Sequence, residues 1–405
     1  MTETVEPQRQ LTDEELAAPL GGEFPNRPHH VLDQLRERCP VAKVTSPAGR
    51  KMWLVTSASH VRAGLQDSRF SSQAMGALAS DKPFRALEAS LLSYDSPDHP
   101  RIRRLANAAF TMRRMRTHRP TVEAAARDLF DALPQSPTPD LMAGFAGPFT
   151  FRVMCDLYGL PEAIRPRFRH LIDVVSVRKD HSLDELNDTI DELGGIFASE
   201  VRKRIEAPAD DLWSDIVRVW KSVDDVTEKE LISLSASIML AGVDSVAQTL
   251  GICFAFLLTH GGLIPRLHAD PALVAPVVEE ILRMDSPTLF TTRRKALEDV
   301  TFGDTLIPAG SEVLFSVTAA NRDPDRYRSP DRLVLNRPAA EGHIAFGLGP
   351  HRCIGAALAR IELAVAVAEL TRRWPAIALA MPAADLRWEN HFAHRRLVEL
   401  PVVLG

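Results

Sequence analysis

The sequence predicts a mainly helical fold with a minor β component, an α+β class in which helices dominate. Residues 101–204 have helical periodicity over most of their length, and residues 228–258 form an almost unbroken helical pattern. Strand signals are confined to short stretches at residues 43–56, 296–315 and 377–404. Because the helical segments are long and the strand segments short, we expect a helical body with a minor sheet.

The N-terminal half is expected to begin with a strand and to continue as helices. Residues 43–56 contain the apolar run Met-Trp-Leu-Val, and Ser57 then caps a short helix. Prolines break the helical pattern of residues 101–204 near residues 134–138 and again at Pro161. This half should therefore form several helices rather than one.

The C-terminal half combines the longest helix with most of the short strands. At about 1.5 Å per residue, residues 228–258 are long enough to span a domain and should run through its middle. Prolines bound a second helix over residues 276–287, and strands follow in residues 296–315. A last helix over residues 354–374 precedes the strand-like end, residues 377–404.

The length and composition favour a globular enzyme with one core. The chain has 405 residues, of which 45% are hydrophobic and 25% charged, which is typical of a protein that buries a sizeable core. Its 29 prolines are spread along the chain and are not gathered into a linker. We expect a flexible segment over residues 1–27 and one catalytic domain over residues 28–405, acting as a monomer.

Charge and cysteine usage exclude several classes of function. The net charge of −5 argues against a nucleic-acid partner, which would require a basic excess. No apolar run looks long enough to span a bilayer and residues 1–20 lack a signal-peptide core, so we expect a cytoplasmic protein without a membrane contact. The four cysteines are scattered, so neither a disulfide framework nor a zinc site is indicated.

One cysteine lies in a sequence suited to metal binding. Residues 346–355 read F-G-L-G-P-H-R-C-I-G and place Cys353 at the start of the helix expected over residues 354–374. The free N–H groups and the positive dipole end of a helix lower a thiol pKa and favour the thiolate, which is the form that binds metals. The glycines of the loop allow backbone to pass close to a flat group. A buried structural cysteine is the alternative.

The pattern F-x-x-G-x-[HR]-x-C-x-G in residues 346–355 resembles the haem-ligand signature of the cytochrome P450 superfamily, and the resemblance covers nearly the whole chain from Pro28 onward. It implies the cytochrome P450 fold, with haem b between a long central helix and the cysteine-bearing loop. It also implies that Cys353 binds the haem iron, with Phe346 and Gly355 beside the haem. A thiolate ligand favours cleavage of the O–O bond of bound dioxygen.

The expected central helix carries a second motif. Residues 240–245, L-A-G-V-D-S, are similar to the family's oxygen-binding pattern [AG]-G-x-[DE]-T. The resemblance assigns Ala241 and Gly242 to the close approach of the helix to the haem. It assigns Asp244 and Ser245 to proton delivery toward dioxygen. A core helix with an isolated polar pair is the alternative.

Ser245 departs from the family pattern, which has threonine there. Serine keeps the hydroxyl group but lacks the β-branch that restricts χ1. Proton delivery should then be less tightly timed. This would suit a reaction that ends in coupling or desaturation instead of oxygen insertion.

Two further motifs are structural or bind the haem edge. Glu280 and Arg283 form E-x-x-R, whose side chains share one helix face. The resemblance implies a third arginine, for which Arg332 is the candidate although Leu333 replaces the usual neighbouring aromatic residue. Four residues match family positions that bind the haem propionates: His99, Arg103, Arg294 and His351. Arg293 is adjacent to Arg294, and a one-residue shift would turn it to the other face of a strand. Each alone could be a solvated surface residue.

A basic stripe suggests the electron donor. The resemblance implies that this face receives an acidic ferredoxin, which takes electrons from NAD(P)H through a ferredoxin reductase, because no reductase follows the final residue. A charged helix face without a partner is the alternative. The stripe comprises Arg101, Arg103, Arg104, Arg113 and Arg114.

The substrate pocket is located by position only. Val243, Leu289, Phe290 and Phe392 are expected to form an apolar wall and Thr288 to orient a polar group, although each could be a core residue. Such a mixed pocket suits a medium-sized natural product. The function expected is a haem-thiolate monooxygenase of secondary metabolism that uses dioxygen. Oxidative coupling of an aromatic cyclodipeptide and a non-catalytic haem sensor are the alternatives.

Overall fold

The computed structural model describes residues 24, 28–75, 91–176, 182–338, 342–389 and 391–405. Contacts divide the chain into two compact units, each built from separated segments. The first unit comprises Met1–Met75, Glu279–Arg352 and Arg387–Val398. The second unit comprises Gly76–Val278, Cys353–Leu386 and Glu399–Gly405. The single domain over residues 28–405 stays a prediction, and the predicted flexible segment, residues 1–27, lies outside the described residues apart from Phe24.

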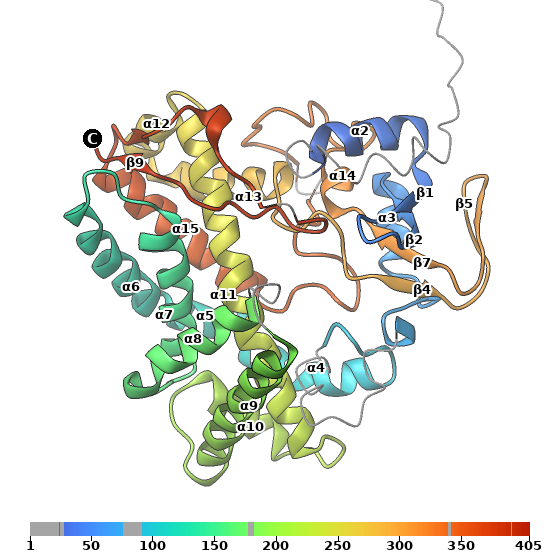
Figure 1. Ribbon diagram of the computed structural model, residues 1–405, viewed down its shortest axis with the longest axis horizontal. Coiled ribbons are helices and arrows are strands. Elements are labelled where there is room, and N and C mark those ends of the chain that lie inside the picture. Colours follow the sequence, from blue (N-terminus) through green and yellow to red (C-terminus); the bar gives the residue numbers. More distant parts are fainter. Residues whose placement is uncertain (1–23, 25–27, 76–90, 177–181, 339–341, 390) are drawn as a thin grey trace, which may run out of the picture. The chain divides into compact units, whose positions relative to one another are not determined.

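The first unit contains a five-stranded mixed sheet, labelled in Figure 1. Its order is β1-β2-β7-β4-β3, in which β2 and β7 are parallel and the other pairs antiparallel. The expected strand over residues 43–56 is in fact a hairpin of two strands, because Gly49 adopts a positive φ of 76° and turns the chain. The strands are β1 (Val41–Thr45), β2 (Lys51–Val55), β3 (Phe70–Ser71), β4 (Arg294–Ala296) and β7 (Glu312–Phe315).

Three short helices and a small hairpin complete the first unit. Side chains of β2 alternate between two cores, so that Met52 and Leu54 enter a core shared with Leu32 and Leu35 of α2. A second core, around Phe70 and Phe315, lies against α3. The remaining elements are α2 (Pro28–Arg38), α3 (Ala58–Gly64), α14 (Val317–Asn321), β5 (Val300–Phe302) and β6 (Thr305–Ile307).

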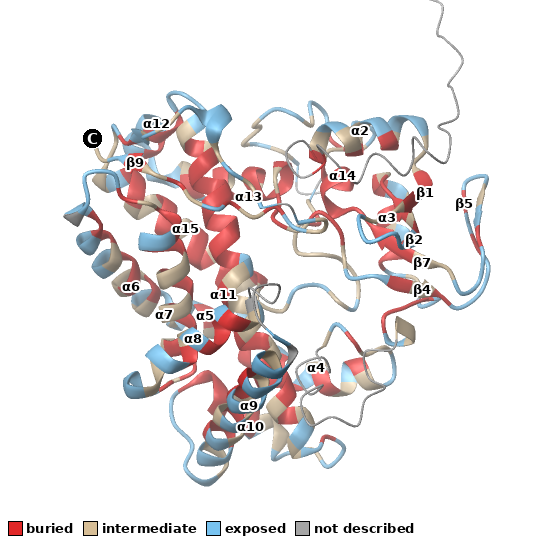
Figure 2. Cartoon of the chain, viewed as in Figure 1, coloured by how far each residue is buried: buried red, intermediate tan, exposed pale blue. Residues whose placement is uncertain are grey.

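The second unit is helical and is organised around α11 (Glu228–Thr259). In Figure 1, α11 runs beside α7 and α15, and Figure 2 shows buried residues along much of it. The predicted central helix, residues 228–258, is thereby confirmed to within a residue. The other helices are α4 (Asp98–Ala109), α5 (Met112–Thr117), α6 (Arg119–Ala132), α7 (Gly147–Leu157), α8 (Arg165–Ser176), α9 (Leu183–Glu206), α10 (Leu212–Trp220), α12 (Leu263–Ala269) and α15 (Ala356–Arg373).

The first turn of α11 is fixed by a capping box that also binds another helix. The Thr227 side chain accepts from the Glu230 amide, and a Glu230 carboxylate oxygen accepts from the Thr227 amide at 2.8 Å. The other Glu230 oxygen accepts from Arg101 of α4 at 2.6 Å. The start of α11 is thus tied to α4.

The end of the chain has less strand than the sequence predicts. Among the described residues of 377–404, β8 (Ala378–Leu379) and β9 (Val402–Val403) alone form a sheet, and an isolated bridge joins Trp388 and Leu397. The helix α13 (Val274–Met284) passes from the second unit into the first. The predicted mainly helical class with minor sheets is confirmed.

Among the described residues, α11 alone is long and apolar enough to cross a membrane by composition. The expectation that no segment reaches that length is therefore wrong. Because 67% of its most apolar window is buried against other helices, α11 behaves as a core helix. The expected cytoplasmic location stays a prediction.

Candidate active site

One turn of α11 is open on one side. Ala241 and Ser245, four residues apart and hence on one face, are exposed, whereas Val243 and Val246 are buried. The open turn lies within a helix that is otherwise largely buried inside the second unit. It therefore provides a surface that a ligand can cover.

The Ser245 hydroxyl is held in place at this open turn. Its Oγ donates to the Ala241 carbonyl oxygen at 2.6 Å, and Thr249 Oγ1 donates to the Ser245 carbonyl at 2.7 Å. This hydrogen bond supplies an orientation that serine lacks intrinsically. Asp244 precedes it and is half-buried. The proton-delivery roles of both residues stay predictions.

Glycine at position 242 is explained by packing between helices. A Cβ atom at this position would lie 2.7 Å from both Sδ and Cε of Met154 on α7. The missing side chain therefore admits α7, so Gly242 is needed for helix packing. Its predicted place beside the haem stays a prediction. Ala241 is the small residue on the open face.

Cys353 is the accessible thiol of the chain. It is exposed, whereas Cys155 and Cys253 are buried and Cys39 is intermediate. Burial raises the pKa of the Cys155 thiol to about 12. Cys353 comes two residues before Gly355, the N-cap of α15, and its Sγ lies 4.0 Å from where a Cβ of Gly355 would stand. The sulfur is thus presented beside the start of α15, which itself packs against α11.

The loop before the cysteine lies at the end of the Glu279–Arg352 segment of the first unit. Gly347 and Gly349 have φ values of 72° and 75°, a left-handed backbone that glycine adopts without strain. A Cβ on Gly349 would lie 2.6 Å from the Leu65 carbonyl oxygen, so this glycine is required by its own unit rather than by a flat ligand. Phe346 and His351 are half-buried, and their roles beside the haem stay predictions.

The predicted propionate ligands are divided between the units. His99, which is 3% exposed, and Arg103 lie on one face of α4, which packs against α11 in the second unit. Arg294 of β4 is buried in the first unit and donates to the Phe70 carbonyl oxygen at 3.2 Å. Arg293 faces outward, in an ion pair with Glu312 at 3.0 Å, as strand alternation predicts. Propionate binding stays a prediction.

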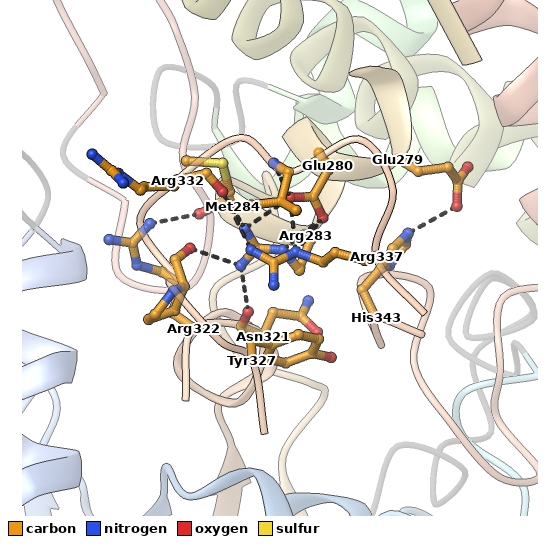
Figure 3. A network of polar contacts seen from close by, with 12 residues as sticks. Glu279, Glu280, Arg283, Met284, Asn321, Arg322, Tyr327, Arg332, Arg337 and His343 are labelled. Carbon is orange, nitrogen blue, oxygen red and sulfur yellow. Dashed lines mark hydrogen bonds and ion pairs between the residues drawn. The ribbon is translucent and has the colours of Figure 1, made fainter. Parts of the chain in front are cut away.

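A buried carboxylate, that of Glu280, organises a network of arginines in the first unit (Figure 3). Glu280 accepts from Arg283 Nε at 2.9 Å, from Arg337 Nε at 2.9 and 3.0 Å, and from the Val334 amide at 2.9 Å. Burial raises the pKa of Glu280, but these donors outweigh it and leave the pKa below its usual value. Glu280 is therefore ionised and satisfied.

The third arginine of this network is Arg337, and the prediction of Arg332 is wrong. The Arg332 side chain is exposed, and the residue contributes only its carbonyl oxygen, which accepts from Arg283 at 3.2 Å. The sequence favoured Arg332 as an arginine that follows the E-x-x-R pair, in residues 323–332. The signal that this prediction missed is Pro338, which disfavours helix at the preceding Arg337 and extends the chain there.

The network also reaches the cysteine loop through two contacts that the sequence did not reveal. Arg283, which is 1% exposed, donates to the Asn321 carbonyl oxygen at 3.0 Å, and Asn321 Oδ1 accepts from the Ile344 amide at 2.8 Å. Glu279 lies 3.0 Å from His343 Nε2. Residues 343–344 are therefore fixed just before Phe346.

The basic stripe is largely compensated within the second unit. Arg101 pairs with Glu230 and Asp98, and Arg104 pairs with Asp225. Arg114 likewise pairs with two aspartates, Asp210 and Asp215. The stripe therefore offers much less net positive charge than its sequence indicates.

Two predicted substrate residues are core residues. Leu289 and Phe290 are 0% and 1% exposed and pack with Phe24 and Leu32, which leaves no surface for a ligand. Their assignment to the pocket wall is therefore wrong. Val243 is buried on α11, whereas Thr288 and Phe392 are half-buried. Substrate contact by these three stays a prediction.

The residues of the second unit fit a haem. An exposed thiol stands beside the start of α15, α15 packs on α11, and α11 has an open turn with a small residue and an anchored hydroxyl. A thiolate is a soft, strongly donating ligand for iron. Cys353 would bind the metal, and the haem would supply the activation of dioxygen.

Comparison with known proteins agrees with this site. The family described as Cytochrome P450 matches residues 168–376. The chain is 35% identical to the mycinamicin IV hydroxylase/epoxidase of Micromonospora griseorubida, over 91% of this chain and 94% of that protein.

Solved structures share the fold over almost the whole length. The cytochrome P450 PksS of the Bacillus subtilis 168 bacillaene polyketide synthase superposes with a TM-score of 0.88 at 32% identity, covering 96% of this chain and 99% of that one. The ligand-free P450 monooxygenase TamI gives a TM-score of 0.88 at 34% identity, covering 95% and 93%. The chain therefore belongs to the cytochrome P450 family of monooxygenases.

Proposed function

We propose that this P450 hydroxylates a medium-sized natural product in secondary metabolism. The balanced reaction takes substrate, dioxygen, two electrons and two protons to hydroxylated substrate and water. Among the similar proteins, one is named a mycinamicin IV hydroxylase/epoxidase and another a polyketide biosynthesis cytochrome P450, which supports this substrate class.

The observation that carries oxygen insertion is the anchored hydroxyl of Ser245. Its Oγ is 2.6 Å from the Ala241 carbonyl, beside half-buried Asp244, on the open turn of α11. A hydroxyl fixed next to a carboxyl group can pass protons to a ligand at this turn. The hydrogen bond to Ala241 favours hydroxylation over coupling, because it orients the Ser245 hydroxyl.

We also infer that electrons come from NAD(P)H through a ferredoxin reductase and a ferredoxin. Because Arg101, Arg104 and Arg114 are paired with carboxylates inside the second unit, the docking of an acidic ferredoxin should depend only weakly on these three. Arg113 is exposed and remains the member of the stripe most able to contact a partner. The rates at which ferredoxin reduces the Arg113→Ala and Arg104→Ala variants, measured across a salt series, would test this ranking, with the larger loss expected for Arg113→Ala.

The central experiment combines a spectrum with an isotope label. The reduced carbon-monoxide complex should show the thiolate band, and Cys353→Ala should lose it while remaining folded. Turnover of a candidate natural product under labelled dioxygen should then place one labelled atom in the product. An unlabelled coupled product would overturn hydroxylation, and a protein that binds haem but never consumes NADPH with any substrate would overturn the enzymatic assignment.

A further inference from the structure

A partly buried charge cluster in the first unit has no part in the proposed chemistry. Asp285 follows the last residue of α13, and its Oδ1 lies 3.0 Å from Arg395 Nε and 3.1 Å from His29 Nε2. Arg395 is 8% exposed, and its guanidinium also stacks on Trp388 at 3.8 Å. The carboxylate therefore joins α2, the end of α13 and the segment Arg387–Val398.

The charge state of this cluster follows from its surroundings. Burial raises the pKa of Asp285, but the Arg395 guanidinium and His29 outweigh the burial and leave the pKa lower than usual. Asp285 is thus ionised at neutral pH. Removing its charge would leave Arg395 buried with its ion-pair partner gone, which is strongly unfavourable.

The segment Arg387–Val398 is a hairpin that is attached to the chain after α13. The Arg395 amide donates to the Pro287 carbonyl oxygen at 2.8 Å, and the Leu289 amide donates to the Ala393 carbonyl oxygen at 3.0 Å. Between them, Thr288 and His394 form an isolated antiparallel bridge. A pairing this short is marginal on its own, so a buried ion pair at one end can decide whether it holds.

The pairing positions two half-buried side chains. Thr288 lies within the paired segment, and Phe392 lies between the paired ends of the hairpin, with its ring 5.2 Å from that of Phe290. Because Phe290 is fixed in the core, Phe392 has a defined place only while the hairpin keeps its register. A slip of one residue would turn paired side chains to the opposite face.

We propose that Asp285 is a positioning residue for substrate selection, which acts through Arg395 to hold Thr288 and Phe392 in register and so limits the size of ligand that the enzyme accepts. The inference rests on the proposed function and on the prediction that Thr288 and Phe392 contact substrate. Asp285 itself touches no reacting atom.

The first test is local and independent of haem chemistry. Hydrogen exchange at the Leu289 and Arg395 amides should speed up in Asp285→Asn by about tenfold or more. The control is Glu312→Gln, which removes a carboxylate in ion pairs with Arg50 and Arg293 in the same unit. Equal exchange at both amides in all three proteins would overturn the positioning role.

The second test measures ligand size. Spectral titrations with imidazole and with 4-phenylimidazole give two dissociation constants. Their ratio measures how strongly the enzyme distinguishes a small ligand from a larger one. In Asp285→Asn this ratio should change by about tenfold, with imidazole binding unaltered, because a small displacement of a contact residue alters fit strongly. Asp285→Glu, which keeps the charge, should restore part of the ratio. An unchanged ratio would refute the proposal.

Two outcomes are kept apart by the controls. If the wild-type protein lacks the thiolate band with carbon monoxide, the proposed function fails, whatever the exchange data show. If the band is present and the exchange and ratio are unaffected, only the inference on Asp285 fails. Should Asp285→Asn not fold, Arg395→Lys keeps the charge but loses the planar contact with Trp388, and the same two measurements apply.

Discussion

At the scale of single residues, the environment of each cysteine sets its reactivity. Cys353 is exposed, whereas Cys155 is enclosed and its pKa is raised to about 12. A thiol reacts as its thiolate, so a buried and protonated sulfur is inert at neutral pH.

The haem-free protein should therefore show selective alkylation. Iodoacetamide at about pH 8, near the ordinary thiol pKa, should label Cys353 first and leave Cys155 and Cys253 unmodified, as read by peptide mass spectrometry. Loading with haem should protect Cys353. Equal labelling with and without haem would contradict its role as the ligand.

Ser245 allows a second test at this scale. Ser245→Ala removes the hydrogen bond to Ala241, whereas Ser245→Thr retains the hydroxyl. We expect the alanine variant to consume NADPH but to form about a tenth or less of the wild-type amount of product per NADPH, because proton transfer contributes at least a tenfold factor. Assays of product and of hydrogen peroxide measure which fraction of the consumed NADPH yields product. A wild-type fraction in the alanine variant would show that the hydroxyl is dispensable.

At the scale of elements, buried carboxylates join segments that are distant in sequence. Glu280 on α13 binds Arg283 on the same helix and Arg337 from the loop that follows α14, and both guanidinium groups lie near the Tyr327 ring. The network thus fixes an irregular loop that hydrogen bonds of regular structure cannot hold.

The correction from Arg332 to Arg337 can be tested by stability. Arg337→Ala should lower the free energy of unfolding by about 3 kcal/mol, because it leaves Glu280 buried with one arginine fewer. Arg332→Ala keeps the backbone carbonyl that accepts from Arg283, so it should change the free energy of unfolding by about 0.5 kcal/mol or less. Urea unfolding of the two haem-loaded variants measures the difference. The reverse order would restore Arg332 as the third member.

Glu369 on α15 gives a pH dependence with a defined sign. Hydrogen bonds from Arg372 and then Arg373 lower the Glu369 pKa from 4.5 to about 2, despite partial burial. A depressed carboxyl pKa stabilises the folded state fully above the unfolded value of 4.5, and this contribution is lost as pH falls toward 2. Wild type should therefore exceed Glu369→Gln in urea midpoint at pH 6, with the gap narrowing at pH 3. A gap that widens toward acid would refute this sign.

At the scale of the whole molecule, the sequence predicted features that depend on local pattern. The helical class and the limits of α11 follow from periodicity, and Cys353 follows from a motif with its own spacing. Features set by contacts between distant segments were not predictable. Arg337 and the packing of Gly242 against Met154 are examples, and so is the core position of Phe290. Each depends on a contact with a residue that is distant in sequence, which a local pattern cannot predict.

Haem removal should lower the stability of the whole protein. A ligand that binds only the folded state stabilises it by about 4 kcal/mol at a thousandfold excess over its dissociation constant. Calorimetry should therefore find a lower melting temperature for the haem-free protein than for the loaded protein. Adding haem should raise the melting temperature of Cys353→Ala less than that of the wild type. Identical melting of loaded and haem-free protein would argue against a specific site.

The capping box of α11 has a consequence for how the chain tolerates change. Glutamate or glutamine can complete the box at position 230, but only an acidic side chain can pair with Arg101. Aspartate is shorter by one methylene, so glutamate alone meets both demands. In a library of all substitutions, this half-exposed position should therefore accept fewer replacements than its exposure would suggest, and glutamine should be the mildest of them.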